Sequence, residues 1–247
     1  MAPARPWRFA LILSLPCPDA ASSPARPPAL TRAFASRPTR EFARPCFEDR
    51  LMAAHPVSLF ELLRSQPIVH LRAEMPGDVS AREALLDAAM GPGRVRKSSE
   101  ALRRGRLPAD GLALVAETED GTLIGSVRLW NVAAGERGGA AVSALLLGPL
   151  AVLPGFAGFG IGSSLMRRAI AEAAFRGHDA IVLVGDAPYY ERFGFSADVA
   201  AGLTMPGPFE RHRLLGLEIE PGALHGAEGM ISATGREIAS EAIAAAA

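Results

Sequence analysis

Residues 141–170 decide the fold of this chain, and they read AVSALLLGPLAVLPGFAGFGIGSSLMRRAI. The apolar run Val142–Val152 is long enough to be a strand that is buried on both faces. Gly148 and Pro149 interrupt this run. Because proline cannot donate to a sheet ladder, the pair predicts a bulge, or the place where the strand parts from its neighbour.

A glycine-rich turn follows the strand and leads into a helix. Gly158, Gly160 and Gly162 alternate with other residues, and Gly177 supplies a helix stop. Between them, apolar side chains recur at helical spacing: Ile161, Leu165, Met166, Ile170 and Ala173. The first amides of a helix have no partners inside it, and glycines let an anion reach them. The turn therefore predicts a site for a diphosphate, and a close-packed turn without a ligand is the alternative.

Two common phosphate-binding motifs fit this turn poorly. A dinucleotide-binding turn has its glycines directly after the first strand and an acidic residue about 20 residues further on. Here a loop intervenes, Ser163 stands in for the last glycine, and Asp186 is the only suitable acid. A P-loop needs a lysine after its glycines, and none follows.

The turn resembles instead the acyl-CoA signature of the GNAT N-acetyltransferase superfamily. That signature reads Gln/Arg-x-x-Gly-x-Gly/Ala after a strand that ends Leu-x-Val-x-Pro. Here the strand ends at 150–154 (LAVLP) and the turn spans 157–162 (AGFGIG), with Ala157 in the place of Gln or Arg. A second segment, 190–195 (YERFGF), resembles the Tyr-x-x-x-Gly-Phe motif of the same family. The resemblance covers roughly residues 69–219 and is to the predicted bacterial N-acetyltransferases of the superfamily.

The resemblance implies a fold of the α/β (α+β) class. Its mixed, mostly antiparallel sheet would have six to seven strands, helices on both faces and one splayed parallel strand pair. It also implies acetyl-CoA as co-substrate, no metal, and transfer of the acetyl group to a primary amine by direct attack in a ternary complex.

The resemblance further implies which residues do this. The pantetheine arm would pair with the backbone of Leu150, Ala151 and Val152 in the splay. The diphosphate would lie on the amides of the glycine turn: Gly158, Phe159, Gly160, Ile161, Gly162 and Ser163. The Val152 N–H would polarise the thioester carbonyl, and Tyr190 would protonate the leaving thiolate.

The sequence does not identify the general base or the acceptor. Three polar residues on neighbouring expected strands are candidates for the base, and a water chain is an alternative: Glu117, Arg128 and Asn131. Three basic residues lie where this family builds its acceptor wall: Arg94, Arg96 and Lys97. They form a solvated face or, if they line the pocket, favour an acidic acceptor. The acceptor is a small-molecule amine or an amine of a peptide or protein.

Two other functions stay open. Ala157 and the absence of a carboxylate on the central strand favour a non-catalytic acyl-CoA-binding or regulatory module as the alternative. The other alternative function is that of a nicotinamide-dependent oxidoreductase.

Composition divides the chain into three parts. Residues 1–67 contain eleven of the twenty prolines and recurrent arginine, so we expect a largely disordered extension. A targeting segment, or a start of translation at Met52, would also explain it. Residues 68–220 form the expected acetyltransferase domain, with helices at 81–90 and 98–104, strands at 112–117, 123–130 and 180–184, a turn at 135–139 and a closing strand at 212–219. Residues 221–247 form the expected C-terminal tail.

The overall charge points to no polyanionic partner. Lys+Arg and Asp+Glu balance at 26 each, so we expect no nucleic acid and no membrane as partner. Cys17 and Cys46 lie outside the expected domain, which suits a reducing compartment and a cytoplasmic location. The five histidines lack metal-ligand spacing, so no metal is expected. A homodimer stays open.

Overall fold

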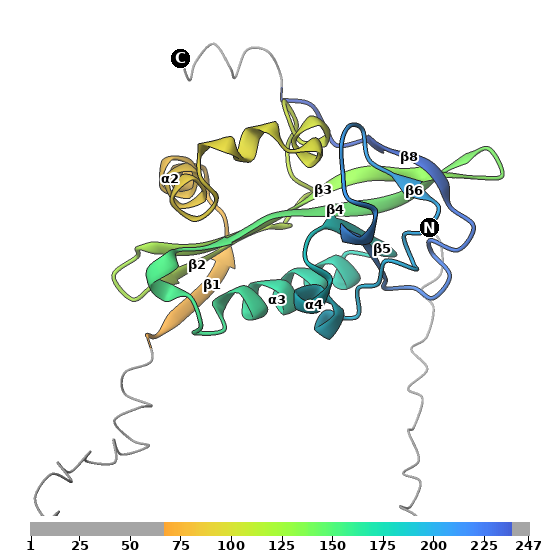
Figure 1. The fold of residues 1–247 in the computed structure, drawn as a ribbon. Coiled ribbons are helices and arrows are strands. Elements are labelled where there is room, and N and C mark those ends of the chain that lie inside the picture. Colours follow the sequence, from red (N-terminus) through yellow and green to blue (C-terminus); the bar gives the residue numbers. More distant parts are fainter. Residues whose placement is uncertain (1–66, 239–247) are drawn as a thin grey trace, which may run out of the picture. The chain divides into compact units, whose positions relative to one another are not determined.

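The structure, a computed structural model, describes residues 67–238 (Figure 1). The predictions for residues 1–66 and 239–247 lie outside the described residues. Eight strands form the sheet: β1 (Val69–Ala73), β2 (Ala113–Thr118), β3 (Leu123–Arg137), β4 (Ala140–Val152), β5 (Ala180–Val184), β6 (Leu203–Thr204), β7 (Leu214–Glu218) and β8 (Glu228–Ala233). The predicted fold class is confirmed, although the sheet has eight strands rather than six to seven.

Helices and 3-10 turns connect some of these strands. The α-helices are α2 (Val79–Met90), α3 (Ile161–Phe175) and α4 (Ala187–Tyr190). The 3-10 turns are η1 (Pro76–Asp78), η2 (Pro92–Arg96), η3 (Ser98–Leu102), η4 (Pro154–Phe156), η5 (Glu191–Phe193) and η6 (Arg211–Arg213). No helix within residues 67–238 is both long and apolar enough to cross a membrane.

The sheet follows the order β1-β2-β3-β4-β5-β7, and β4 and β5 are its parallel neighbours. The long strand β3 pairs with β2 through its first half and with β8 through its second half. The short strand β6 runs parallel to β8. Strand β8 lies in the segment that the sequence analysis assigned to the C-terminal tail, so residues after 220 complete one edge of the sheet.

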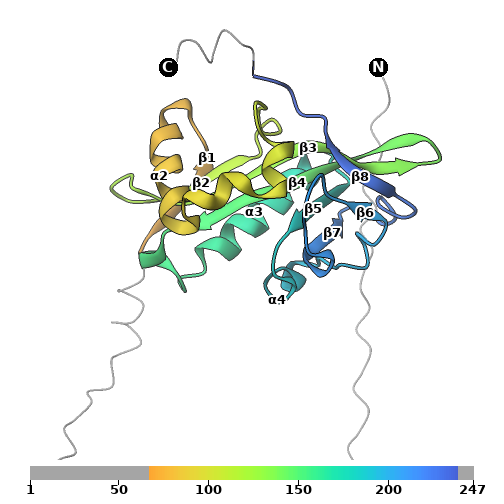
Figure 2. The same ribbon diagram turned by 45° about the horizontal axis from the view of Figure 1, so that its top comes forward.

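Helices α2 and α3 cover opposite faces of the sheet (Figures 1 and 2). Side chains of a strand alternate between the two faces. In β2, Leu114 and Ala116 accordingly belong to the apolar cluster of α3, whereas Val115 packs with Leu85 and Leu86 of α2. Both faces are therefore buried, as the apolar run in β4 predicts.

Two elements differ from the sequence predictions. The second helix expected at 98–104 is the 3-10 turn η3, because Gly105 with φ +72° follows before a full α-helix can form. The turn expected at 135–139 is confined to Gly138 and Gly139, since β3 continues to Arg137. Pairing with β8 supports this extension, and sequence periodicity alone does not reveal that partner.

Candidate active site

Strands β4 and β5 part where Gly148 and Pro149 interrupt the apolar run. The two strands pair at Leu145 with Ile181 and at Leu146 with Val182, and no further pairs follow along them. On the other edge of β4, the register with β3 shifts because Gly148 and Pro149 together lie opposite the single residue Arg128. This is the two-against-one arrangement of a β-bulge, and it turns the end of β4 away from β5.

A cavity of about 590 Å³ occupies the wedge between the parted strands. Its walls include residues 147–152 of β4, Val184 and Gly185 at the end of β5, and Gly162 in the first turn of α3. The opposite wall comes from α2, η2 and η3. A volume of this size lies in the range of small-molecule sites, which is about 300–1,000 Å³.

The free edge of β4 presents backbone donors to this cavity. The amide of Leu153 donates to the Ile124 carbonyl of β3 at 2.9 Å. Backbone groups of a strand alternate between its two neighbours, so the amides of Leu150 and Val152 face the splay instead. Both amides thus lie on the edge where a bound chain could add as a further strand.

The glycine turn is open at the mouth of α3. Gly160 caps the helix with φ +75°, a left-handed conformation that glycine adopts without a steric penalty. A Cβ on Gly158 or Gly160 would meet no atom within 4 Å. Among residues 67–238 the amides of Ile161, Gly162 and Ser163 have no acceptor, and the first helical bond runs from Ser164 N to the Gly160 carbonyl at 3.0 Å. These donors and this space suit a diphosphate group.

The tyrosine pair reaches the cavity from α4. The ring of Tyr190 packs directly on Gly185 and stacks edge-on against Phe195, with ring centroids 6.0 Å apart. Burial raises the pKa of Tyr190 to about 12, and the nearby Tyr189 and Asp186 add to the shift. The phenol therefore stays protonated and keeps a hydrogen to donate at neutral pH.

The cavity gathers part of the predicted site. Five predicted residues line it directly: Leu150, Ala151, Val152, Gly162 and Tyr190. The other predicted residues belong to the same turn without lining the cavity: Gly158, Phe159, Gly160, Ile161 and Ser163. Ile161 in particular buries its side chain in the core under α3, so only its backbone is available to a ligand.

Of the three candidates for the general base, two lie outside the cavity and the third, Arg128, lines the cavity but is bound to the carboxylate of Glu74. Glu117 pairs with Arg72 at 2.7 Å and does not line the cavity, and neither does Asn131. Arg128 lines it, as do Arg94 and Lys97 from the predicted acceptor wall.

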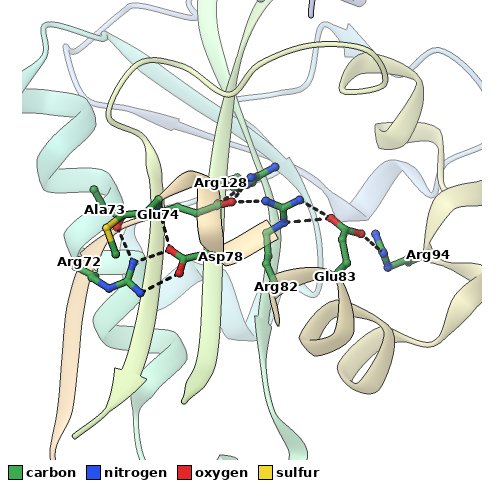
Figure 3. A network of polar contacts seen from close by, with 9 residues as sticks. Arg72, Ala73, Glu74, Asp78, Arg82, Glu83, Arg94 and Arg128 are labelled. Carbon is green, nitrogen blue, oxygen red and sulfur yellow. Dashed lines mark hydrogen bonds and ion pairs between the residues drawn. The ribbon is translucent and has the colours of Figure 1, made fainter. Parts of the chain in front are cut away.

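A chain of ion pairs connects β1, α2, η2 and β3 beside the cavity (Figure 3). The buried carboxylate of Glu74 binds both Arg82 and Arg128. Glu83 in turn binds Arg82 at 2.6 Å and also Arg94. Burial opposes the ionisation of Glu83, but hydrogen bonds from the two arginines outweigh it and lower its pKa. Glu83 is therefore a poor proton acceptor.

Two cavity residues have no counterpart in the sequence analysis. Tyr189 places its hydroxyl beside Gly162, where a Cβ would lie 2.8 Å away. Arg103 buries its guanidinium near Gly148, with 9% of the side chain exposed. For Tyr189 the sequence does carry a signal, because this residue is adjacent to Tyr190. Consecutive residues of a helix point in different directions, so two adjacent tyrosines place their rings on different sides of the helix. Arg103 carries no sequence signal, because it is one of several arginines in and around the helix expected at 98–104.

Within residues 67–238, no group of three or more His, Cys, Asp and Glu side chains is placed to hold a metal ion.

Comparisons with known proteins agree with this geometry. A family model described as an acetyltransferase (GNAT) domain matches residues 109–197, which run from just before β2 to beyond the tyrosine pair. The uncharacterized N-acetyltransferase YjhQ of Escherichia coli (strain K12) is 35% identical over 71 residues, a match that covers 28% of this chain and 39% of that relative.

Solved structures extend the comparison over more of the chain. The GNAT family N-acetyltransferase YhbS from Escherichia coli, in complex with CoA, is 26% identical with a TM-score of 0.56. That match covers 68% of this chain and 90% of YhbS. A GNAT family acetyltransferase from Brucella melitensis, in complex with acetyl-CoA, is 31% identical with a TM-score of 0.48, over 62% of this chain and 90% of its own. With its bulged and parted strands and its open glycine turn, the chain belongs to the GNAT N-acetyltransferase superfamily.

Proposed function

We propose that this protein is an acyl-CoA-dependent N-acyltransferase that moves the acetyl group of acetyl-CoA to a primary amine. The observation that carries the proposal is the wedge between β4 and β5, which opens beside the unpartnered amides at the start of α3. The CoA complex of the related YhbS supports this choice of co-substrate.

The wedge and the turn beside it offer separate sets of backbone amides for the diphosphate and for the pantetheine arm of CoA. The amides of residues 161–163 would receive its diphosphate, since three N–H groups converge there on an open turn. The amides of Leu150 and Val152 would bond the pantetheine arm, which would lie along β4 in place of the missing strand. This arrangement would bring the thioester into the cavity near Val152 and the tyrosine pair.

The reaction needs one amine, one thioester and two proton movements. The amine nitrogen attacks the thioester carbonyl, so a C–N bond forms and the C–S bond breaks. The Val152 N–H would donate to the carbonyl oxygen as negative charge develops on it. The nitrogen loses one proton, and Tyr190 would supply one to the departing thiolate sulfur. Both reactants are bound together, so no covalent enzyme intermediate is required.

Within the part of the chain that the structure describes, no carboxylate that lines the cavity is free of an arginine partner and so available to accept the amine proton. Three carboxylates line the cavity, and each is paired with arginine: Glu83, Glu100 and Asp186. A water chain that carries the proton to solvent is therefore the better candidate for the base. The same pairing favours the alternative function, a non-catalytic acyl-CoA-binding or regulatory module.

Two measurements test the proposal and separate it from the alternative. Calorimetry with acetyl-CoA should show saturable binding by the full chain, and absence of binding at millimolar concentration would contradict both functions. A thiol-release assay over several classes of amine should then show CoA formation that depends on the acceptor. Binding of CoA without release for any class would leave the regulatory module as the function.

A further inference from the structure

The acceptor side of the cavity carries an excess of positive charge. Six basic side chains from α2, η2, β3 and the segment around η3 line it: Arg82, Arg94, Lys97, Arg103, Arg104 and Arg128. From the same elements, two acidic side chains line it, Glu83 and Glu100. The excess matters for recognition only if these cations lack partners within the fold.

Half of these cations are neutralised by the protein itself. Glu74 binds Arg82 and Arg128, and Glu83 binds Arg82 and Arg94 (Figure 3). Arg94 also donates to Asp87 at 2.8 Å. These three arginines therefore belong to a network in which carboxylates of the protein neutralise most of their charge.

The other three cations lie at η2 and η3 and are less well paired. Lys97 has no ion pair within residues 67–238, and Arg104 donates only to the carbonyl of Val95 at 3.3 Å. Both side chains are exposed at the rim of the cavity. Among the described residues Arg103 has one carboxylate partner, Glu100, whose Oε2 lies 2.9 Å from the Nη2 of Arg103.

Arg103 is the informative member of this group. Nine-tenths of its side chain is buried, and its Nε–H has no hydrogen-bond partner among the described residues. Its Nη1 lies beside Gly148, 3.6 Å from where a Cβ would stand, so the guanidinium faces the bulge at which β4 and β5 part. Burial lowers the pKa of Arg103, and Glu100 offsets only part of this effect. A buried guanidinium with unused donors is costly unless an anion completes its shell.

We propose that the acceptor amine also carries a carboxylate, and that Arg103 binds this carboxylate, with Lys97 and Arg104 at the rim attracting it. This inference names the substrate class of the proposed acyltransferase and rests on that function. Arginine suits the role because its planar fork can bind both oxygens of a carboxylate. Since Arg103 faces the bulge, the carboxylate and the reacting amine should be separated by only a few bonds, as in amino acids.

The test is a thiol-release assay with matched acceptor pairs. The common L-amino acids, β-alanine and γ-aminobutyrate are each compared with their own carboxamide, which keeps the amine and removes the negative charge. We expect at least one acid to exceed its amide in kcat/KM by about thirtyfold or more, which corresponds to a charge pair worth about 2 kcal/mol. In Arg103→Gln this ratio should fall toward one, and in Arg103→Lys it should recover in part.

Two further variants keep the test decisive. Lys97→Gln changes an exposed rim residue and should lower the same ratio by about two- to fivefold. This variant tests the inference even if Arg103→Gln does not fold, and an unchanged ratio would count against the rim cations. Arg168→Gln, on the exposed surface of α3, is the matched control and should leave the ratio unchanged.

The outcomes separate this inference from the proposed function. Equal rates for acids and amides, or no release with any carboxylate-bearing amine, would overturn the inference while CoA binding and release with neutral amines uphold the acyltransferase. A loss of CoA affinity in Arg103→Gln equal to the loss of acceptor activity would assign the guanidinium to CoA and overturn it as well. Absence of CoA binding in the unaltered protein would overturn both.

Discussion

The hydroxyl of Tyr189 stands where a side chain on Gly162 would have to lie. A Cβ at Gly162 would be 2.8 Å from the Tyr189 hydroxyl oxygen and 3.7 Å from a methyl group of Val152. The guanidinium of Arg192 stacks on the Tyr189 ring at 4.1 Å, and Tyr190 packs against the ring edge-on. The end of β4, the first turn of α3 and helix α4 therefore meet around one glycine.

Substitution Gly162→Ala should impair the proposed reaction without weakening the fold. The new methyl group would displace the Tyr189 ring at the place where the thioester is expected, and kcat/KM for acetyl-CoA should fall by about 10²-fold. Alanine is favoured over glycine in a helix, by up to about 1 kcal/mol in the interior and by less in the first turn, so the melting temperature should not fall. Steady-state kinetics and thermal unfolding measure the two effects. Gly155→Ala, where a Cβ meets no atom within 4 Å, is the control, and equal kinetics for both variants would contradict the prediction.

Substitution Tyr190→Phe should reduce kcat by about 10²- to 10⁴-fold and leave the affinity for CoA nearly intact. The change removes the proton donor but keeps the ring that packs on Gly185 and Phe195. Tyr189→Phe is the matched comparison, since it also removes one hydroxyl from the cavity wall. If Tyr189→Phe alone loses activity, the proton donor is Tyr189.

Tyr190 should also make the fold sensitive to high pH. Its pKa is about 12 in the folded protein, against about 10 for a free phenol. Below pH 10 the phenol is protonated in both states and its full contribution to stability is present. Between pH 10 and 12 the unfolded state loses its proton first, so the free energy of unfolding falls, by up to about 3 kcal/mol from this group. Chemical denaturation across this range should show a shallower fall for Tyr190→Phe than for the unaltered protein.

The parts of this fold that local chemistry determines can be predicted from the sequence. The bulge at Gly148–Pro149 was predictable because proline lacks the N–H that a sheet ladder needs. The open helix mouth was predictable because glycines alternate at the start of a periodic apolar pattern. Strand β8 was not, since its place in the sheet depends on the second half of β3, which lies about a hundred residues away in sequence.

The acceptor side of the cavity shows the same limit. Arg82 and Arg103 fall in the helices expected at 81–90 and 98–104, and Arg94 falls between them, so all three are arginines of one expected helical segment. In the structure Glu74 and Glu83 hold two of them, while the third, Arg103, is buried with Glu100 as its one carboxylate partner and an Nε–H that has no acceptor among the described residues. The difference comes from contacts between β1, α2 and β3 that are distant in the chain, so residue type and spacing could not separate the three.

Substitution Asp78→Asn should destabilise the protein at neutral pH and abolish part of its acid sensitivity. Asp78 accepts hydrogen bonds from Arg72 and from the amide of Met75 just before α2, and these bonds lower its pKa to about 2. Its contribution to stability is thus complete above pH 4 and is lost as pH falls from about 4 to 2. We expect a loss of about 2 kcal/mol at pH 7, the usual worth of a hydrogen bond to a charged group. Urea unfolding of both proteins at pH 7 and pH 2 checks this, and a difference that persists unchanged at pH 2 would contradict it.

The carboxylate of Glu74 is the centre of the ion-pair network beside the cavity. Its side chain is 5% exposed, and it binds the buried guanidinium of Arg82 and the Nε of Arg128, the latter at 2.7 Å. Without this carboxylate, Arg128 has no acidic partner within residues 67–238, and Arg82 has only the half-exposed Glu83. Removing one member of a buried ion pair leaves the other charge desolvated, which is more costly than the pair itself is favourable.

Substitution Glu74→Ala should therefore lower the free energy of unfolding by about 3–5 kcal/mol, with a smaller loss for Glu74→Gln, which keeps an oxygen to accept from the arginines. The midpoint of urea unfolding measures the loss, and an unchanged m-value would show that the folded and unfolded states keep their usual compactness. Asp110→Asn is the control, because Asp110 and its partner Arg236 are 87% and 70% exposed and such a pair contributes within about 0.5 kcal/mol. Equal losses in Glu74→Ala and Asp110→Asn would mean that water reaches the network. Arg82 and Arg128 would then be as free as Lys97 to bind an anionic acceptor, and the distinction between paired and unpaired cations in the cavity would not hold.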